Sequence, residues 1–257
     1  DIDALSEATK AARTRLFQEF KPSPAAPTLI GFTATPHRTD TIGLEYVFDE
    51  IAFSRTIREM MEAGWLCKIV GQRVQTDASL AGVKIAHGDY QEGQLSSAVN
   101  TPERNDLAVK SYLALAAGRP FLCFCVDVQH TRDMCAAFNQ AGIAAKSIVG
   151  STIKADRQLS EQHYRGGRIP GLINCMVLTE GFDAPRTSCI IMARPTKSSL
   201  LYTQMLGRGT RIAPGKEDLL VIDLADTGAA GVSSVNTLFG LPPRLNLGDS
   251  DVLSVQQ

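Results

Sequence analysis

Two arginines lie three residues apart in the segment "QMLGRGTR", which begins at Gln204 and places Gly207 and Gly209 around the first of them. The two arginines are Arg208 and Arg211. A guanidinium keeps its charge at physiological pH and can donate parallel hydrogen bonds to two anionic oxygens. If this turn is helical, positions i and i+3 lie on the same face. The segment therefore predicts either a site for an anionic ligand or a pair of solvated surface charges.

Three further segments combine small residues with hydroxyl side chains: "GFTATPHRTD" from position 31, "VGSTIKADR" from 149 and "NCMVLTEGFDAP" from 174. Hydroxyl groups, and backbone N–H groups at the start of a helix, suit the phosphate oxygens of a nucleotide or a nucleic-acid backbone. The alternative for each is a local role, as a helix cap or a threonine-rich strand end. The hydroxyl candidates are Thr33, Thr35, Ser151, Thr152 and Thr179.

A regular alternation of strands and helices must position these segments. The expected strands are "PFLCFCV", "IAAKSIVG", "PGLINC", "TSCIIMARP" and "DLLVIDLA", and amphipathic helices separate them. Strands that alternate with helices of about 10–15 residues indicate βαβ units and a parallel sheet covered on both faces. Because ligands bind beyond the carboxyl ends of strands in such sheets, we expect all four polar segments at strand ends. The predicted fold class is α/β.

The earlier part of the chain is less regular. It predicts a helix over 6–20, strands at "TLIGFT", "IAFSRTI" and "CKIVGQRVQTD", and a helix at "REMMEAGW". Residues 77–100 are expected to be a polar excursion of low order. Thr101 followed by Pro102 is typical of a helix start, and Trp65 and Phe53 are expected in the core.

Composition limits the function classes. The chain has 257 residues, 44% of them hydrophobic and 21% charged, with a formal net charge of −1. Any nucleic-acid binding must therefore come from a local basic patch. Six cysteines without a C-x-x-C pair indicate buried thiols in a reducing compartment, and we assign no metal ligand. No apolar run is long enough to span a membrane, so we expect an intracellular, cytoplasmic protein, associated with the nucleoid if bacterial.

Taken in order, the polar segments resemble the later motifs of superfamily 2 helicases and translocases of the DEAD/DEAH type. "TAT" resembles motif III, "FLCFCVDVQHT" motif IV, "LTEGFD" motif V and "Q-x-x-G-R-x-x-R" motif VI. The combination with "ARPT-x-S" is most similar to the branch of restriction-enzyme motor subunits and XPB-like translocases. The resemblance covers about residues 28–226 and implies RecA-like folding: a remnant of the first motor domain in 1–50, a complete second domain in 51–226, and an irregular tail in 227–257.

The resemblance also implies roles for the candidate residues. Such motors bind ATP between two RecA-like domains, and arginines of motif VI stabilise charge on the transferred phosphoryl group. Arg208 and Arg211 would be those catalytic arginines, with Arg211 the preferred finger. Gln204, Gly207, Gly181 and Asp183 would line the ATP cleft. Thr33 and Thr35 would couple hydrolysis to nucleic acid, and Ser151, Thr152 and Thr179 would lie along the nucleic-acid track.

The earlier motifs of the family are missing from this chain. It contains no G-x-x-x-x-G-K-[ST] sequence, and "GTRIAPGKE" fails the spacing. Asp49 and Glu50 imitate an acidic box but follow "TAT", whereas the family order places the box before it. We therefore expect that the P-loop, the Mg²⁺ ligands and the general base lie before residue 1 or are absent, and that the isolated chain does not hydrolyse ATP.

The expected partners are ATP with Mg²⁺ and a nucleic acid, DNA rather than RNA, with room for a larger complex. The alternative is a non-catalytic RecA-like module that binds nucleic acid or another protein.

Overall fold

The computed structural model describes residues 29–33, 48, 50–179, 181–243, 245, 247–248 and 250–256. The chain divides into two units, Asp1–Ser54 and Arg55–Gln257. The predicted helix over 6–20, Thr35 and Asp49 lie outside the described residues. The described fold is therefore that of the second unit.

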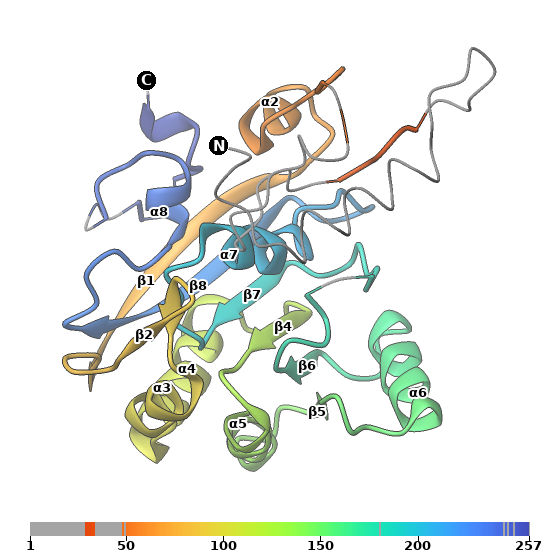
Figure 1. Ribbon diagram of the computed structural model, residues 1–257. Coiled ribbons are helices and arrows are strands. Elements are labelled where there is room, and N and C mark those ends of the chain that lie inside the picture. Colours follow the sequence, from red (N-terminus) through yellow and green to blue (C-terminus); the bar gives the residue numbers. More distant parts are fainter. Residues whose placement is uncertain are drawn as a thin grey trace, which may run out of the picture. The chain divides into compact units, whose positions relative to one another are not determined.

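Six parallel strands form the central sheet of this unit (Figure 1). Their order across the sheet is β1-β8-β7-β4-β6-β5, and every neighbouring pair is parallel. The strands are β1 (Lys68–Ser79), β4 (Phe121–Phe124), β5 (Ala145–Ile148), β6 (Gly171–Asn174), β7 (Cys189–Met192) and β8 (Asp218–Thr227). The α/β fold class with a parallel sheet is confirmed.

Helices and short elements connect the strands. The longer helices are α4 (Pro102–Leu115), α5 (Val128–Gln140), α6 (Lys154–Arg165) and α7 (Ser199–Gly207). The shorter elements are α2 (Ile57–Glu62), β2 (Ile85–Ala86), β3 (Asp89–Tyr90), α3 (Glu92–Val99), α8 (Val235–Leu238) and the 3₁₀ turn η3 (Ser254–Gln256). Among the described residues, no helix combines the length and the apolar character needed to cross a lipid bilayer.

Two apolar clusters cover the two faces of the sheet. In β4, Phe121 and Cys123 belong to the cluster that contains buried residues of α4 and α5, whereas Leu122 and Phe124 belong to the cluster with those of α6 and α7. This division follows from the strand geometry, because successive side chains point to opposite faces. Strands buried on both faces read as continuous apolar runs, which is why the sequence pattern predicted them.

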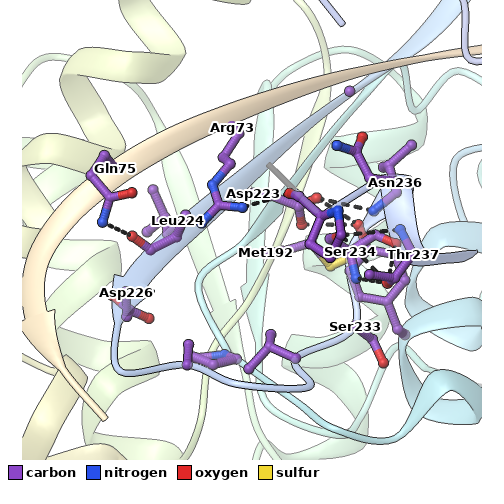
Figure 2. A pocket seen from close by; sticks show the side chains of 18 of the residues that line it. Arg73, Gln75, Met192, Asp223, Leu224, Asp226, Ser233, Ser234, Asn236 and Thr237 are labelled. Atoms are coloured by element: carbon purple, nitrogen blue, oxygen red, sulfur yellow. Dashed lines mark hydrogen bonds between the residues drawn. The ribbon is translucent and has the colours of Figure 1, made fainter. Parts of the chain in front are cut away.

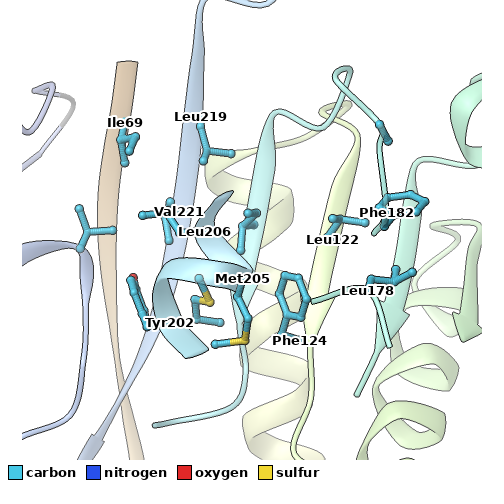
Figure 3. Packing of buried hydrophobic residues seen from close by; sticks show 14 of the residues in the cluster. Ile69, Leu122, Phe124, Leu178, Phe182, Tyr202, Met205, Leu206, Leu219 and Val221 are labelled. Carbon is cyan, nitrogen blue, oxygen red and sulfur yellow. The ribbon is translucent and has the colours of Figure 1, made fainter. Parts of the chain in front are cut away.

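Helix α7 contributes buried residues to the cluster that contains Leu122 and Phe124 (Figure 3). Its Tyr202, Met205 and Leu206 are buried together with Leu219 and Val221 of β8. Positions 202, 205 and 206 follow the i, i+3, i+4 spacing that places residues on one helical face. The helix that carries the arginine segment is thus anchored along the centre of the sheet.

Local capping fixes the helix starts. Thr101 accepts a hydrogen bond from Arg104 N at 3.3 Å with Pro102 at the first position, as the sequence predicted. Asp127 caps α5 in the same way through His130 N at 2.8 Å. Side-chain oxygens at these positions satisfy backbone donors that the helix leaves unpaired.

Three local predictions are wrong. Residues 29–33, the described part of the predicted strand "TLIGFT", form no strand. The segment "IAFSRTI" forms no strand; instead Thr56 and Glu59 make a capping box that starts α2. Residues 77–100 are ordered, because Leu80 packs in a small buried cluster with Tyr90 of β3 and Leu95 of α3. Reciprocal side-chain bonds and a few buried apolar residues are sufficient to order a segment whose average polarity is high.

The described part of the C-terminal tail packs along β1. Val252 N donates to Ile69 O at 3.0 Å, and Val70 makes an antiparallel bridge with Asp251. Val235 and Leu247 of the tail are buried in the same cluster as α7. The tail has little regular structure, yet its apolar residues complete the core on this face.

Candidate functional site

The arginine segment lies at the amino-terminal edge of the sheet, not at a strand end as predicted. Helix α7 ends at Gly207, Arg208 is its C-cap, and the chain then turns toward the start of β8. Arg211 forms an antiparallel bridge with Leu66, just before β1, and Cys67 N donates to Thr210 O at 2.9 Å. A helix that connects two parallel strands runs from the carboxyl-terminal edge of the sheet back to the amino-terminal edge. The arginine segment follows the C-terminus of α7 and therefore lies at the amino-terminal edge.

Both arginines converge on one carbonyl of the segment after β6. Arg208 Nη1 donates to Phe182 O at 3.1 Å, and Arg211 Nη1 reaches the same oxygen at 3.5 Å. Arg211 Nε lies 3.3 Å from Asp183 Oδ1. The turn is not one continuous helix, but it brings the two guanidinium groups together as i, i+3 spacing would. Asp183 therefore belongs to an arginine network.

The glycines of this region have different roles. A Cβ on Gly209 would overlap Leu219 Cδ1, so the turn packs directly on the core and a larger residue would have to displace the Leu219 side chain. Gly181 has room for a Cβ but adopts a φ of +68°, which favours glycine. At Gly207, neither a close neighbouring atom nor a positive φ requires glycine. Gly207 is the last residue of α7, one turn after the half-buried Gln204.

Lys216 binds backbone carbonyls in and beside the arginine turn, which comprises residues 208–211. Its ammonium donates to Arg211 O at 2.7 Å and to Pro185 O at 3.4 Å, and it also contacts Gly209 O. Burial lowers the pKa of Lys216. An ammonium that binds carbonyls on both sides fixes the backbone from which Arg211 extends.

The loop after β5 holds Ser151 and Thr152 at the opposite, carboxyl-terminal edge. Thr152 Oγ1 accepts from Val149 N at 2.9 Å, and Thr152 N donates to Val149 O at 2.9 Å. The N-cap of α6 is Ile153, which makes no side-chain capping bond, so the helix-capping alternative is wrong for both hydroxyls. Thr152 closes the turn, whereas Ser151 is exposed.

Thr179 is buried rather than presented at the surface. Its side chain is 5% exposed and its hydroxyl donates to Met176 O at 3.2 Å. Met176 is 52% exposed and has a φ of +54°, which is unusual for a residue with a side chain. In this loop Thr179 sets the backbone, and the exposed side chain is one that the sequence analysis did not select.

The remaining candidates fall in or near the first unit. Thr33 is exposed and lies in the described stretch 29–33. Thr35 lies outside the described residues. Trp65 and Phe53, predicted in the core, are 67% and 75% exposed, so that prediction is wrong. A single aromatic residue gives no periodicity from which burial can be inferred.

A cavity of about 740 Å³ lies between β8, the middle of β1 and the tail (Figure 2). Asp223 lines this cavity, and both its oxygens accept from Tyr202 Oη at 2.9 Å while Val235 N donates to one of them at 3.2 Å. Burial raises the pKa of Asp223 to about 6, against the lowering effect of these hydrogen bonds and of Arg73. The cavity does not include the arginine turn.

Asp223 gives a test of pH dependence. The carboxyl titrates near pH 6 when folded and near 3.9 when unfolded, so the folded state binds more protons between about pH 4 and pH 6. Its contribution to stability therefore falls as the pH rises through that window and stays low above it. We expect Asp223→Asn to raise the free energy of unfolding at pH 7.5 by about 1–3 kcal/mol, and to make the decline between pH 4 and pH 6 shallower.

Urea unfolding at pH 4.5 and pH 7.5 measures this effect. Asp106→Asn on α4 is the control, because that carboxylate is exposed beside Lys110. A loss of stability on Asp223→Asn at pH 7.5 would show that the fold requires the charged carboxylate.

Known proteins share this domain. A model of the helicase conserved C-terminal domain matches residues 104–213, which span α4 to the arginine turn. The Saccharomyces cerevisiae protein IRC3, whose name gives it as an ATP-dependent helicase, is 34% identical over 245 residues, covering 93% of this chain and 36% of the relative. Residues 104–213 therefore carry a helicase conserved C-terminal domain.

Restriction-enzyme subunits resemble this helicase domain as well. The EcoKI endonuclease subunit of the Escherichia coli type I restriction enzyme is 28% identical over 164 residues, covering 58% of the chain and 14% of the subunit. A fragment of an HsdR subunit of a type I restriction enzyme from Vibrio vulnificus has a TM-score of 0.59 at 22% identity, over 75% of this chain and 38% of that one. The chain spans about a third of the length of IRC3.

Sequence analysis missed one arginine of this helicase domain. Arg165, the last residue of α6, donates from Nε to Asp183 O at 2.9 Å, and its guanidinium lies 5.2 Å from the centre of the Phe182 ring. Its position at a helix C-terminus suggests only an interaction with the helix dipole. The contact with Asp183 depends on how α6 packs, which no local pattern shows.

Proposed function

We propose that this chain supplies the second RecA-like motor domain of an ATP-dependent nucleic-acid helicase or translocase. In this proposal, residues 51–226 form that domain and residues 1–50 are the end of the first one. The observation that carries it is the convergence of Arg208 and Arg211 on the Phe182 carbonyl, beside Asp183. Two fixed cations held on a rigid turn suit the oxygens of a triphosphate.

The arginines would act on the transferred γ-phosphoryl group. Negative charge develops on its oxygens during transfer, and a positioned guanidinium stabilises that charge. Arg211 is the preferred finger, because its side chain is 39% exposed and its neighbour Lys216 fixes the backbone behind it. Gln204, Gly207 and Gly181 would line the same cleft.

ATP would arrive with Mg²⁺. Among the described residues, no three carboxylate, histidine or cysteine side chains gather into a group that could hold a metal ion. We infer that the Mg²⁺ ligands and the phosphate-binding loop belong to the other half of the cleft. The isolated chain would then provide arginines without the groups that hold the nucleotide.

Nucleic acid would bind at the carboxyl-terminal edge. Ser151 and Thr152 after β5 would contact the nucleic-acid backbone, with Thr33 and Thr35 coupling that contact to hydrolysis. We propose DNA rather than RNA, on the support of the similarity to restriction-enzyme subunits. A helicase or translocase of this kind would also be able to work as part of a larger complex.

An ATPase assay on the native polypeptide tests the proposal. We expect ATP hydrolysis that duplex DNA stimulates, and no turnover by the isolated 257-residue chain. Hydrolysis by the isolated chain would show that the missing motifs are not needed. If the native polypeptide binds DNA but does not hydrolyse ATP, the non-catalytic RecA-like module becomes the better description.

The compartment is also a proposal. All six cysteines are free, which supports a reducing, intracellular location. A relative from Schizosaccharomyces pombe is named as mitochondrial, so an organelle is an alternative to the cytoplasm.

A further inference from the structure

Helix α6 carries three charged residues at i, i+4 spacing along one face. Arg157 Nε lies 2.9 Å from Glu161 Oε1, and Arg165 Nη2 lies 3.1 Å from Glu161 Oε2. One carboxylate therefore binds two arginines, each through a different oxygen. The carboxylate is 14% exposed, while the two arginines are 39% and 47% exposed.

The same line of contacts continues from α6 to the arginine turn. Arg165 Nε donates to Asp183 O at 2.9 Å, and Asp183 Oδ1 lies 3.3 Å from Arg211 Nε. Arg165 also lies over the ring of Phe182, whose carbonyl accepts from Arg211. A series of contacts, which passes through the backbone carbonyl and then the carboxylate of Asp183, thus links the first turns of α6 to Arg211.

The two ends of this series of contacts lie at different edges of the sheet. Arg157 is one turn into α6, directly after the Ser151–Thr152 loop at the carboxyl-terminal edge. Arg211 is paired with Leu66 at the amino-terminal edge. The helix spans the distance between them, and its charged face makes the connection.

A nucleic-acid phosphate near Arg157 would compete with the Glu161 carboxylate for the Arg157 guanidinium. A phosphate that attracts Arg157 weakens the bond of Arg157 to Glu161, because one guanidinium divides its donors between two anions. Glu161 then pairs more strongly with Arg165, and this changes how firmly Arg165 holds the Asp183 carbonyl. The position of Arg211 depends on that same residue through the Asp183 carboxylate.

We propose that Glu161 and Arg165 are positioning residues that couple a nucleic-acid phosphate near Arg157 to the Asp183–Arg211 pair, and so set the stimulation of ATP hydrolysis by nucleic acid. The proposal rests on the function proposed above. It adds a physical connection between the two sites, made by residues outside the motifs that resemble the family.

Glu161→Gln tests the coupling in the native polypeptide. The amide keeps the shape of the side chain but removes the charge that the two arginines share. Partly exposed pairs of this kind contribute little to stability, so the variant should fold. We expect the ratio of DNA-stimulated kcat to basal kcat to fall roughly two- to thirtyfold, with basal kcat, KM for ATP and Kd for duplex DNA unchanged.

Asp106→Asn is the matched control, because Asp106 and Lys110 form an exposed i, i+4 pair on α4. Arg165→Lys adds a second measurement: lysine retains the charge but cannot bind Glu161 and the Asp183 carbonyl with a rigid fork. We expect it to lower the stimulation ratio as well, by less than Arg165→Ala does.

Stimulation in Glu161→Gln equal to that in Asp106→Asn overturns the coupling, as does a fall explained entirely by a weaker Kd for DNA. Absence of ATP turnover in the unaltered polypeptide, or turnover that Arg211→Ala leaves intact, instead overturns the proposed function on which the coupling depends.

Discussion

Replacing Arg211 by alanine in the native polypeptide is expected to lower kcat for ATP hydrolysis by a factor of about 10³–10⁵. The guanidinium is held by Asp183 at 3.3 Å and by the Phe182 carbonyl at 3.5 Å, so it is in place before the charge develops. Preorganised donors of this kind act mainly on the transition state. ATP binding, measured separately as Kd, should change much less than kcat.

Three further variants test whether the lower kcat of Arg211→Ala comes from the loss of its guanidinium. Arg132→Ala removes an exposed arginine of α5, on the other face of the sheet, and should leave kcat unchanged. Arg211→Lys keeps the charge without the fork and should remain strongly impaired. Asp183→Asn loosens the finger without removing it and should have a smaller effect. A rise in KM at constant kcat in Arg211→Ala would contradict a transition-state role.

Replacing Asp226 by alanine is expected to reduce the free energy of unfolding by about 3–5 kcal/mol, because it leaves a buried charge unpaired. Arg104 of α4 binds the Asp226 carboxylate through Nε and Nη2, each at 2.8 Å, and both side chains are almost completely buried. Thr76 Oγ1 donates to the same carboxylate at 2.5 Å, and Arg104 Nη1 donates to Ala193 O at 2.9 Å. The pair joins α4 to the carboxyl ends of β1, β7 and β8.

Urea unfolding of the domain measures this loss. The double variant Arg104→Met/Asp226→Leu removes both charges together and should be far closer to the original stability than either single change. Asp106→Asn again provides an exposed control. A single variant as stable as the double one would mean that water or another group compensates for the unpaired charge.

The strand and helix pattern of residues 101–226 was predictable because it depends on local signals. Apolar runs such as "CIIM" mark strands buried on both faces, and Thr101 with Pro102 marks the start of α4. The parallel sheet follows from the alternation of these elements. The ordered motifs identified the family for the same reason, since each motif is a short run of the chain.

The contact of both arginines with one carbonyl was only partly predictable from the sequence. The spacing of Arg208 and Arg211 indicated that they would lie together, but their common partner, the Phe182 carbonyl, lies 26 and 29 positions away in the chain. The predicted edge of the sheet is wrong, because the arginine segment follows the C-terminus of helix α7 and not the end of a strand. Thr179 was expected to contact nucleic acid, but it is buried, and its hydroxyl donates to the carbonyl of Met176, which has a positive φ.

The sequence by itself determined the fold class, the order of the elements and the family, because these are recorded in short-range periodicity and in motifs whose residues are close in the chain. Only the tertiary structure decided the long-range partners: Arg165 at the Asp183 carbonyl, 18 positions away, and Arg104 with Asp226 across 122 positions. A charged residue has the same appearance in the sequence whether it is solvated or paired. Its partner is selected by the packing of helices on a sheet, and that packing sums many weak contacts that no local pattern contains.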